Sequence, residues 1–269
     1  MKLTADQTEQ FDSEGYLFFP DAFSAREIEI VREEIPAIFA MEREEVWREK
    51  DGKAVRTAFA AHQYNEVFRV LSNHSRLIEP VMQLLGGPVY IHQNKINGKA
   101  AFDGEVWQWH QDYGTWARDD LMPEPRAMNI ALFLDEVTEF NGPLMLIPRS
   151  HRAGKLEAGH DLQTTSYPLW TLDKATVTRL AEDGGMVAPK GKAGSVLLFH
   201  CNIVHSSPPN ISPWNRTILY LSLCHVDNHI RQFKRPEWIA HRDFTAIEPL
   251  ADDCLLEIDR GETVTATDS

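Results

Sequence analysis

The chain has 269 residues, and 43% of them are apolar, which is enough for a sizeable hydrophobic core. Its formal net charge of −13 argues against binding to nucleic acid or to an anionic membrane surface. The three cysteines are too few for a disulfide framework or a structural zinc site, and no apolar run reaches the roughly 18 residues that span a membrane.

The first 87 residues are predicted to be mostly helical. They begin without the apolar stretch of a signal peptide, which favours a cytoplasmic location. Thr4-x-x-Gln7 and Ser24-x-x-Glu27 have the spacing of capping boxes, in which each end of the motif satisfies a free backbone N–H at the start of a helix. The predicted elements are a helix that ends at Gly15, a strand over 16–19 and a helix over 25–41.

Residues 42–56 are rich in charged side chains and are expected to be exposed or mobile. A helical pattern returns over 65–85 and stops at Gly86-Gly87. From there, short apolar and β-branched runs alternate with Gly, Pro and Asn, which is typical of a β-sandwich or barrel. One domain is therefore predicted, with its β-core over 88–250 and a frayed tail over 257–269. The expected strands are 88–97, 127–134, 143–147, 195–200 and 216–224.

The most informative motif is His110-x-Asp112. Two residues apart in extended structure, the imidazole and the carboxylate point to the same side and can hold one metal ion. A second histidine from a later strand would complete a two-histidine, one-carboxylate face with open positions. The motif alone is weak, because His225-x-Asp227 and His241-x-Asp243 have the same spacing.

Downstream sequence distinguishes the three pairs. After Asp112 there is room for several strands before the next candidate histidines, His200 and His205, whereas no separate strand can return a histidine to the two later pairs. His200 ends an apolar run, where a structural role is expected. His205 follows that strand and precedes a Ser-Pro turn, so it is the preferred third ligand.

Arg216 lies ten residues beyond His205 at the start of a predicted strand, where a fixed guanidinium would suit the distal carboxylate of 2-oxoglutarate. Gln93, Lys95, Asn97 and Lys99 share one face of the strand that begins near Val89. Two interpretations of this row remain open: a half-solvated strand face, or a polar wall for a ligand with a carboxylate.

Three strings together resemble the phytanoyl-CoA dioxygenase family, over about residues 3–250. They are Trp-x-Trp-His110-x-Asp112, the stretch from Thr138 to His151 that contains Asn-Gly-Pro-Leu-Met-Leu-Ile-Pro, and His205-x-Ser-x-Pro-Asn210-x-Ser-Pro-x-x-Arg216. The resemblance is greatest to the branch that contains ectoine hydroxylase and the free L-leucine 5-hydroxylase.

This resemblance implies a mainly β fold with N-terminal helices, whose core is a double-stranded β-helix (jelly-roll, cupin-like). It implies Fe(II) on His110, Asp112 and His205, and 2-oxoglutarate and O₂ as co-substrates. Hydroxylation of an unactivated C–H bond would release succinate and CO₂. The retained Asp112 favours hydroxylation, because related halogenases lack this carboxylate. The further residues implied at the co-substrate site are Arg216, Lys99, Asn97, Trp116 and Thr217.

For the substrate, the resemblance implies a small amino-acid-like molecule. A free aliphatic amino acid such as leucine is favoured, and ectoine or an imino acid is the alternative. Gln93 is expected to contact it, while His62 and Arg242 are candidates for which a surface or core role is equally open. Segment 155–185 departs from both relatives and is expected to form a lid that selects the substrate.

Two other classes stay open. A zinc hydrolase would use the same three ligands with a metal-bound water, and it would need neither Arg216 nor Lys99. A non-catalytic jelly-roll protein would keep the metal pocket without turnover, so that succinate formation would separate it from the enzyme.

Overall fold

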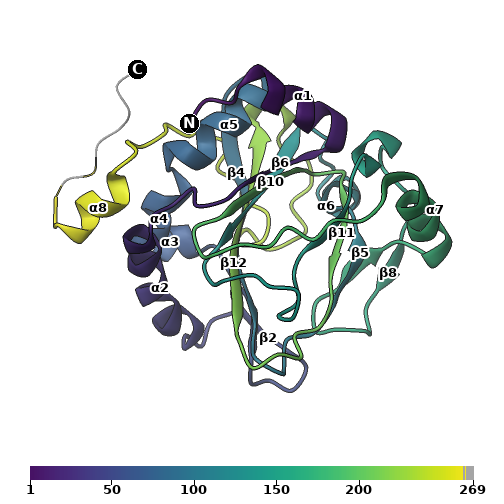
Figure 1. Cartoon of the computed structure of the whole chain (residues 1–269), viewed down its shortest axis with the longest axis horizontal. Coiled ribbons are helices and arrows are strands. Elements are labelled where there is room, and N and C mark those ends of the chain that lie inside the picture. The colour runs from purple at the N-terminus through teal and green to yellow at the C-terminus, as the bar shows by residue number, and fades with distance from the viewer. Residues whose placement is uncertain (263, 265–269) are drawn as a thin grey trace.

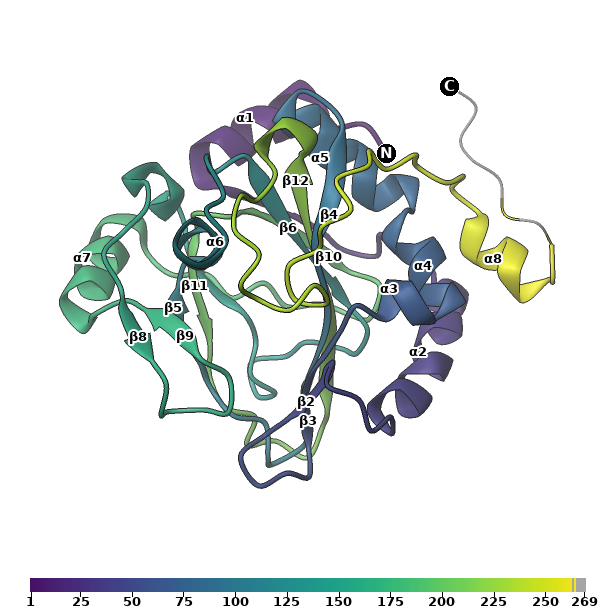
Figure 2. The ribbon, with the colours of Figure 1, turned by 180° about the vertical axis from the view of Figure 1, so that it is seen from behind.

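In the computed structural model, which describes residues 1–262 and 264, a large antiparallel sheet lies between a layer of helices and a smaller sheet. Figure 1 shows α2 to α5 on one side of the large sheet and β5 and β11 on the other. The view from behind places α6, β8, β9 and α7 beside the smaller sheet (Figure 2). The two facing sheets are the predicted jelly-roll core.

Both predicted capping boxes are present. Helix α1 (Ala5–Glu14) is capped by Thr4 and ends at Gly15, whose φ of 83° lies in the left-handed region that glycine tolerates. Helix α2 (Ala25–Phe39) is capped by Ser24, as the sequence predicts, and ends two residues before the predicted boundary. These helices form because polar caps satisfy the free N–H groups of the first turn.

The helix predicted over 65–85 is two helices. Asn65 accepts a hydrogen bond from the backbone N–H of Phe68 and so starts α4 (Glu66–Ser72). His74 does the same for α5 (Ser75–Leu85), which ends at Gly86 as expected. A further turn, α3 (Ala61–Tyr64), precedes them.

The prediction that residues 42–56 are exposed or mobile holds only in part, because residues 42–44 and 50–53 are exposed but the others are partly or fully buried. They form β2 (Val46–Arg48) and lead into β3 (Val55–Phe59), an antiparallel pair at the edge of the large sheet. The charges of Glu49 and Arg56 are buried there in a 3.0 Å ion pair. Charge density therefore misled the prediction, because paired charges can be buried.

The large sheet has the order β1-β10-β6-β12-β4-β3-β2, and the smaller one the order β5-β11-β7. Every strand pair is antiparallel. The remaining bounds are β1 (Tyr16–Phe19), β10 (Val196–His200), β6 (Ala127–Phe133), β12 (Arg216–His225), β4 (Val89–Lys99), β5 (Trp107–His110), β11 (Val204–Ser207) and β7 (Met145–Ile147).

The large sheet buries side chains on both faces, with period-two alternation. In β12, Leu219 and Leu221 pack into the core under the helices, whereas Ile218 and Tyr220 belong to the core between the sheets. Residues Gln93, Lys95 and Asn97 of β4 face the same inter-sheet space as Tyr220. The space between the sheets is therefore where polar side chains can meet a ligand.

Segment 155–185 contains β8 (Gly159–Asp161), β9 (Leu169–Thr171) and α7 (Lys174–Gly184). Residues 257–259, expected to be frayed, belong instead to α8 (Cys254–Asp259). Of the rest of that expected tail, residue 263 and residues 265–269 lie outside the described residues. Within the described part of the chain, no helix is both long and apolar enough to cross a membrane.

Candidate active site

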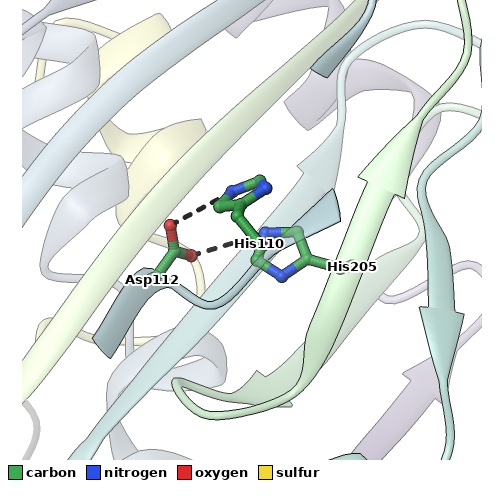
Figure 3. A group of neighbouring side chains, drawn as sticks. All are labelled: His110, Asp112 and His205. Carbon is green, nitrogen blue, oxygen red and sulfur yellow. Dashed lines mark ion pairs between the residues drawn. The ribbon is translucent and has the colours of Figure 1, made fainter. Parts of the chain in front are cut away.

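His110, Asp112 and His205 converge between the sheets (Figure 3). Strands β5 and β11 pair so that His205 lies directly opposite His110, and Asp112 opens helix α6 (Asp112–Asp119). The Nε2 atoms of His110 and His205 each lie 3.6 Å from one carboxylate oxygen of Asp112. One ligand atom from each residue lies within 4.8 Å of the other two, which suits a single metal ion.

The backbone orients both imidazoles. Nδ1 of His110 lies 2.6 Å from the carbonyl oxygen of Gln108, and Nδ1 of His205 lies 3.0 Å from that of Ile203. A carbonyl only accepts, so each Nδ1 carries the proton and each Nε2 is left as an acceptor. Hydrogen bonds of this kind fix the tautomer and direction of metal-binding histidines.

The charges around the triad favour metal ligation. Burial opposes ionisation of Asp112, but the Lys95 ammonium and the two imidazoles outweigh it and hold the pKa of Asp112 well below its usual range. Burial, with His110 beside it, lowers the pKa of His205 to about 3. At neutral pH the site thus presents an anionic carboxylate and a neutral His205 imidazole, the states that bind cations.

The competing histidine motifs have other roles. His200 accepts a hydrogen bond from the backbone N–H of Asn202 and packs against Phe11. His225 accepts from the backbone N–H of Asp227, and His241 lies beside Glu237. One detail of the prediction is wrong: His110 and Asp112 do not share a strand, because β5 ends at His110 and α6 begins at Asp112.

A cavity opens beside the triad, and all three triad residues line it. Its polar wall consists of the β4 side chains Gln93, Lys95 and Asn97, with Ser207 and Tyr220 from β11 and β12. Its apolar wall includes Trp107, Trp116, Leu144, Tyr167 and Leu169. The polar row on β4 therefore faces a cavity over three of its four members.

Arg216 is buried, with the Nε and Nη1 atoms of its guanidinium lacking any partner among the described residues. Burial lowers the pKa of Arg216, while the neighbouring Tyr220 hydroxyl, which reaches the cavity, raises it. Unpaired buried donors are costly unless a ligand satisfies them. A carboxylate that accepts both N–H groups fits this observation.

Lys99 and Thr217 do not line the cavity, and neither does Arg216, although its neighbour Tyr220 does. The Lys99 ammonium donates to the carbonyl oxygens of Glu105 and Pro208, the latter at 2.7 Å. Thr217 sits on the opposite face of β12 from Arg216, where its backbone N–H donates to Asp135. Lys95 is the lysine that faces the cavity, since its ammonium has no hydrogen-bond acceptor among the described residues and lies 5.7 Å from the centre of the Tyr220 ring.

The candidate substrate residues separate in the same way. Gln93 lines the cavity, and its side-chain amide donates to the carbonyl of Ile239. His62 packs against His241 away from the cavity. The exposed Arg242 donates to the backbone carbonyls of Phe233 and Arg235, so it holds the loop that carries Arg235 rather than lining the cavity.

Arg235 is a cavity residue that the sequence did not reveal. Its Nε donates to Oδ1 of the buried Asp120 at 2.8 Å, and its Nη2 donates to Oδ2 of the same carboxylate. The Nη1 atom of Arg235 has no acceptor among the described residues. Nothing in the local string Lys-Arg-Pro marks this role, because the partner carboxylate is 115 residues away. Tyr167 and Leu169 come from segment 155–185, the predicted lid.

Comparison with known proteins agrees with this geometry. Residues 11–218 match the Phytanoyl-CoA dioxygenase (PhyH) family. The chain is 36% identical to the ectoine dioxygenase of Bordetella parapertussis, over 92% of this chain and 86% of that protein. It is 35% identical to the L-proline trans-4-hydroxylase of Streptomyces griseoviridis, over 93% of this chain and 97% of that one.

Solved structures give the same result. The crystal structure of EctD from S. alaskensis with bound Fe has a TM-score of 0.81 and 33% identity, with 92% of this chain and 87% of that chain covered. The structure of EctD with 2-oxoglutarate and 5-hydroxyectoine has a TM-score of 0.80 at the same identity, with coverage of 91% and 86%. The chain therefore belongs to the phytanoyl-CoA dioxygenase family.

Proposed function

We propose that this protein hydroxylates a small cyclic carboxylic acid, with ectoine as the first candidate and L-proline as the second. At the coarser level the protein is an Fe(II)- and 2-oxoglutarate-dependent hydroxylase of a small substrate. The observation that carries the substrate proposal is Arg235, which lines the same cavity as the His110, Asp112 and His205 triad and whose Nη1 has no acceptor among the described residues.

The chain's own residues supply binding and orientation. His110, Asp112 and His205 would hold Fe(II), and the unpaired donors of Arg216 would take the distal carboxylate of 2-oxoglutarate. Lys95 and Asn97 face the space beside the triad and would neutralise and orient the co-substrate. Bound Fe(II) supplies activation of O₂, so that 2-oxoglutarate becomes succinate and CO₂ while one oxygen atom enters a substrate C–H bond.

Asn97 has a free donor group for the co-substrate. Its side-chain oxygen accepts a 2.9 Å hydrogen bond from Thr57, which leaves its N–H₂ group free to donate into the cavity. Trp107 and Leu144 line the same space with apolar surface and exclude water from it. The unpaired guanidinium and the donor amide together favour a dicarboxylate co-substrate over the zinc hydrolase, which requires neither.

The substrate end of the cavity suits a compact zwitterion. The Arg235 guanidinium can pair with a carboxylate, and Gln93 offers an amide oxygen to a ring N–H. Trp116 and Tyr167 present aromatic surface, which attracts a delocalised or secondary ammonium cation. Ectoine and L-proline both combine a ring, a carboxylate and such a cation.

L-Leucine, favoured by short matches in the sequence, has less support, since the relatives compared here are named for ectoine and proline. Proline is retained because the match covers 97% of the proline hydroxylase, compared with 86% of the ectoine dioxygenase. L-Lysine should be a poor substrate, because Asp112 is the only carboxylate lining the described cavity and it is committed to the metal.

A succinate-release screen tests the proposal. Purified protein with Fe(II), 2-oxoglutarate and O₂ is offered ectoine, L-proline, L-leucine or L-lysine, and the hydroxylated products are identified by mass spectrometry. We expect product from ectoine or L-proline at a rate at least tenfold above the other two. The Asp112→Ala variant should form no product with any substrate. Preferred turnover of leucine or lysine would reject the substrate assignment, and an absence of succinate with all four would favour the non-catalytic alternative.

A further inference from the structure

The metal-binding carboxylate is held by two buried residues of the large sheet that do not line the cavity. The side-chain N–H₂ of Asn129 donates a 2.8 Å hydrogen bond to Oδ2 of Asp112. The Ser222 hydroxyl donates a 2.6 Å hydrogen bond to the side-chain oxygen of Asn129. We propose that Ser222 and Asn129 form a positioning relay that holds the Asp112 carboxylate in the orientation in which it faces both triad histidines.

The fold aligns this relay. Asn129 of β6 and Ser222 of β12 are direct partners in the antiparallel register, and both are fully buried. Asp112 reaches them from the first turn of α6 across the inter-sheet space. Two strands of the large sheet thus control a carboxylate carried by a helix, although neither strand carries a metal ligand.

The direction of the relay follows from its donors and acceptors. An ionised Asp112 can only accept, so the Asn129 amide must present its N–H₂ group to the carboxylate. The amide oxygen then faces Ser222, whose hydroxyl donates to it. Without Ser222 the amide could rotate and bring its oxygen against the Asp112 carboxylate, so the serine selects the useful orientation.

The consequence lies in the direction of the Asp112 carboxylate. Asn129 binds Oδ2, which lies 3.6 Å from Nε2 of His205, while Oδ1 lies 3.6 Å from Nε2 of His110. A carboxylate held in this direction is ready to bind a metal ion together with the two imidazoles, and without Asn129 it could turn away from them. This inference rests on the proposed function, because it needs a metal on the triad.

The sequence contains a matched control. Asn94 and Ser72 form a second buried Asn–Ser pair, in which the Asn94 amide donates to Ser72 at 2.8 Å. Asn94 lies in the same large sheet, on β4, but neither member of this pair touches a triad residue. Ser72→Ala therefore removes a similar hydroxyl without touching the relay.

The test is the affinity of the metal-free protein for Mn²⁺, measured from the electron paramagnetic resonance signal of free Mn²⁺, with the melting temperature of each apoprotein as a check on folding. Asn129→Ala should weaken binding roughly 10- to 100-fold, as is usual for outer-shell partners of metal ligands. Ser222→Ala should weaken it by about 5-fold, the value of one neutral hydrogen bond. Ser72→Ala should stay within about twofold of the wild type.

Mn²⁺ binding by folded Asn129→Ala with wild-type affinity would overturn the relay. If that variant does not fold, Ser222→Ala decides, and wild-type affinity in it has the same meaning. An equal loss in Ser72→Ala would also overturn the relay, because the effect would then come from general softening of the sheet. Failure of the wild-type protein to bind Mn²⁺ is a separate outcome, since it would remove the metal centre and the proposed function together.

Discussion

At the scale of single residues, the state of Arg216 decides what the site can bind. A guanidinium stays charged even where burial lowers its pKa, and two of its nitrogen atoms have no acceptor within the described residues. A buried charge without partners lowers the free energy of unfolding, and a bound ligand carboxylate would offset this loss. This argument needs no metal and so gives independent support for the co-substrate.

Arg216→Ala should raise the KM for 2-oxoglutarate roughly 10- to 100-fold, because a charge-assisted hydrogen bond contributes about 1.5–3 kcal/mol. Mn²⁺ affinity should change by less than about twofold. Lys99 provides the control, since it pairs with Arg216 in the β12–β4 register but donates to two carbonyls. Lys99→Met should lower the melting temperature and leave this KM within roughly threefold. Steady-state kinetics on both variants measure these KM values. An unchanged KM for 2-oxoglutarate in Arg216→Ala would reject the assignment.

At the scale of elements, helix α6 links the metal to the substrate. Its first residue, Asp112, is a metal ligand, and Trp116 in its middle lines the cavity. Asp119, its last residue, accepts from the indole N–H of Trp170 in β9, and Asp120 just beyond it holds Arg235. One short helix therefore connects the triad to β9 and to Arg235 on the far side of the same cavity.

Asp120→Asn should weaken substrate binding without changing 2-oxoglutarate binding. The substitution keeps the size of the side chain but removes the charge that pairs with Arg235, so the guanidinium loses its fixed direction. We expect the substrate KM to rise about tenfold or more, the 2-oxoglutarate KM to change little, and the melting temperature to fall, since one charge of a buried pair is left alone. Asp119→Asn makes the same charge change at the same helix end and should keep the substrate KM within roughly twofold. Equal KM values in the two variants would contradict the role given to Asp120.

The elements also show what local sequence can predict. Caps at Thr4 and Ser24 were correctly identified because a capping box is a contact between residues three positions apart. Residues 42–56, expected to be exposed or mobile, instead include β2 and the start of β3, where the buried Arg56 pairs with Glu49 and stacks on Trp107. Partners 51 residues apart, such as Arg56 and Trp107, leave no local signal.

At the scale of the whole molecule, the triad was predictable because only one His-x-Asp pair had a later histidine at a plausible distance. The jelly-roll followed from the resemblance rather than from periodicity, which favoured only a sandwich or barrel. The cavity residues Arg235 and Tyr167 were not predictable in this way: Arg235 reaches the cavity because Asp120 anchors it, and Tyr167 is supplied by segment 155–185. Such residues depend on the tertiary packing.

The stability of the whole fold should depend on buried neutral histidines. His74 caps α5, and burial, reinforced by the Arg76 charge, lowers its pKa to about 4, although Glu27 and Asp252 oppose this shift. In the unfolded chain its pKa is about 6.5. Between these values the unfolded chain binds more protons, so the free energy of unfolding must fall as the pH drops. This loss of unfolding free energy is absent above about pH 6.5, grows as the pH falls to about 4, and is constant below that.

His74→Asn isolates this contribution, because asparagine can accept the same backbone N–H at the helix start but does not titrate. Between pH 7 and pH 5 the wild type should lose about 2 kcal/mol more of its unfolding free energy than the variant, by the linkage of one pKa unit to 1.36 kcal/mol. Urea unfolding at several pH values measures the difference, and any lost ring packing against Phe23 is a constant offset. Parallel curves for wild type and His74→Asn would show that folding does not lower the pKa of His74, which its burial argues against.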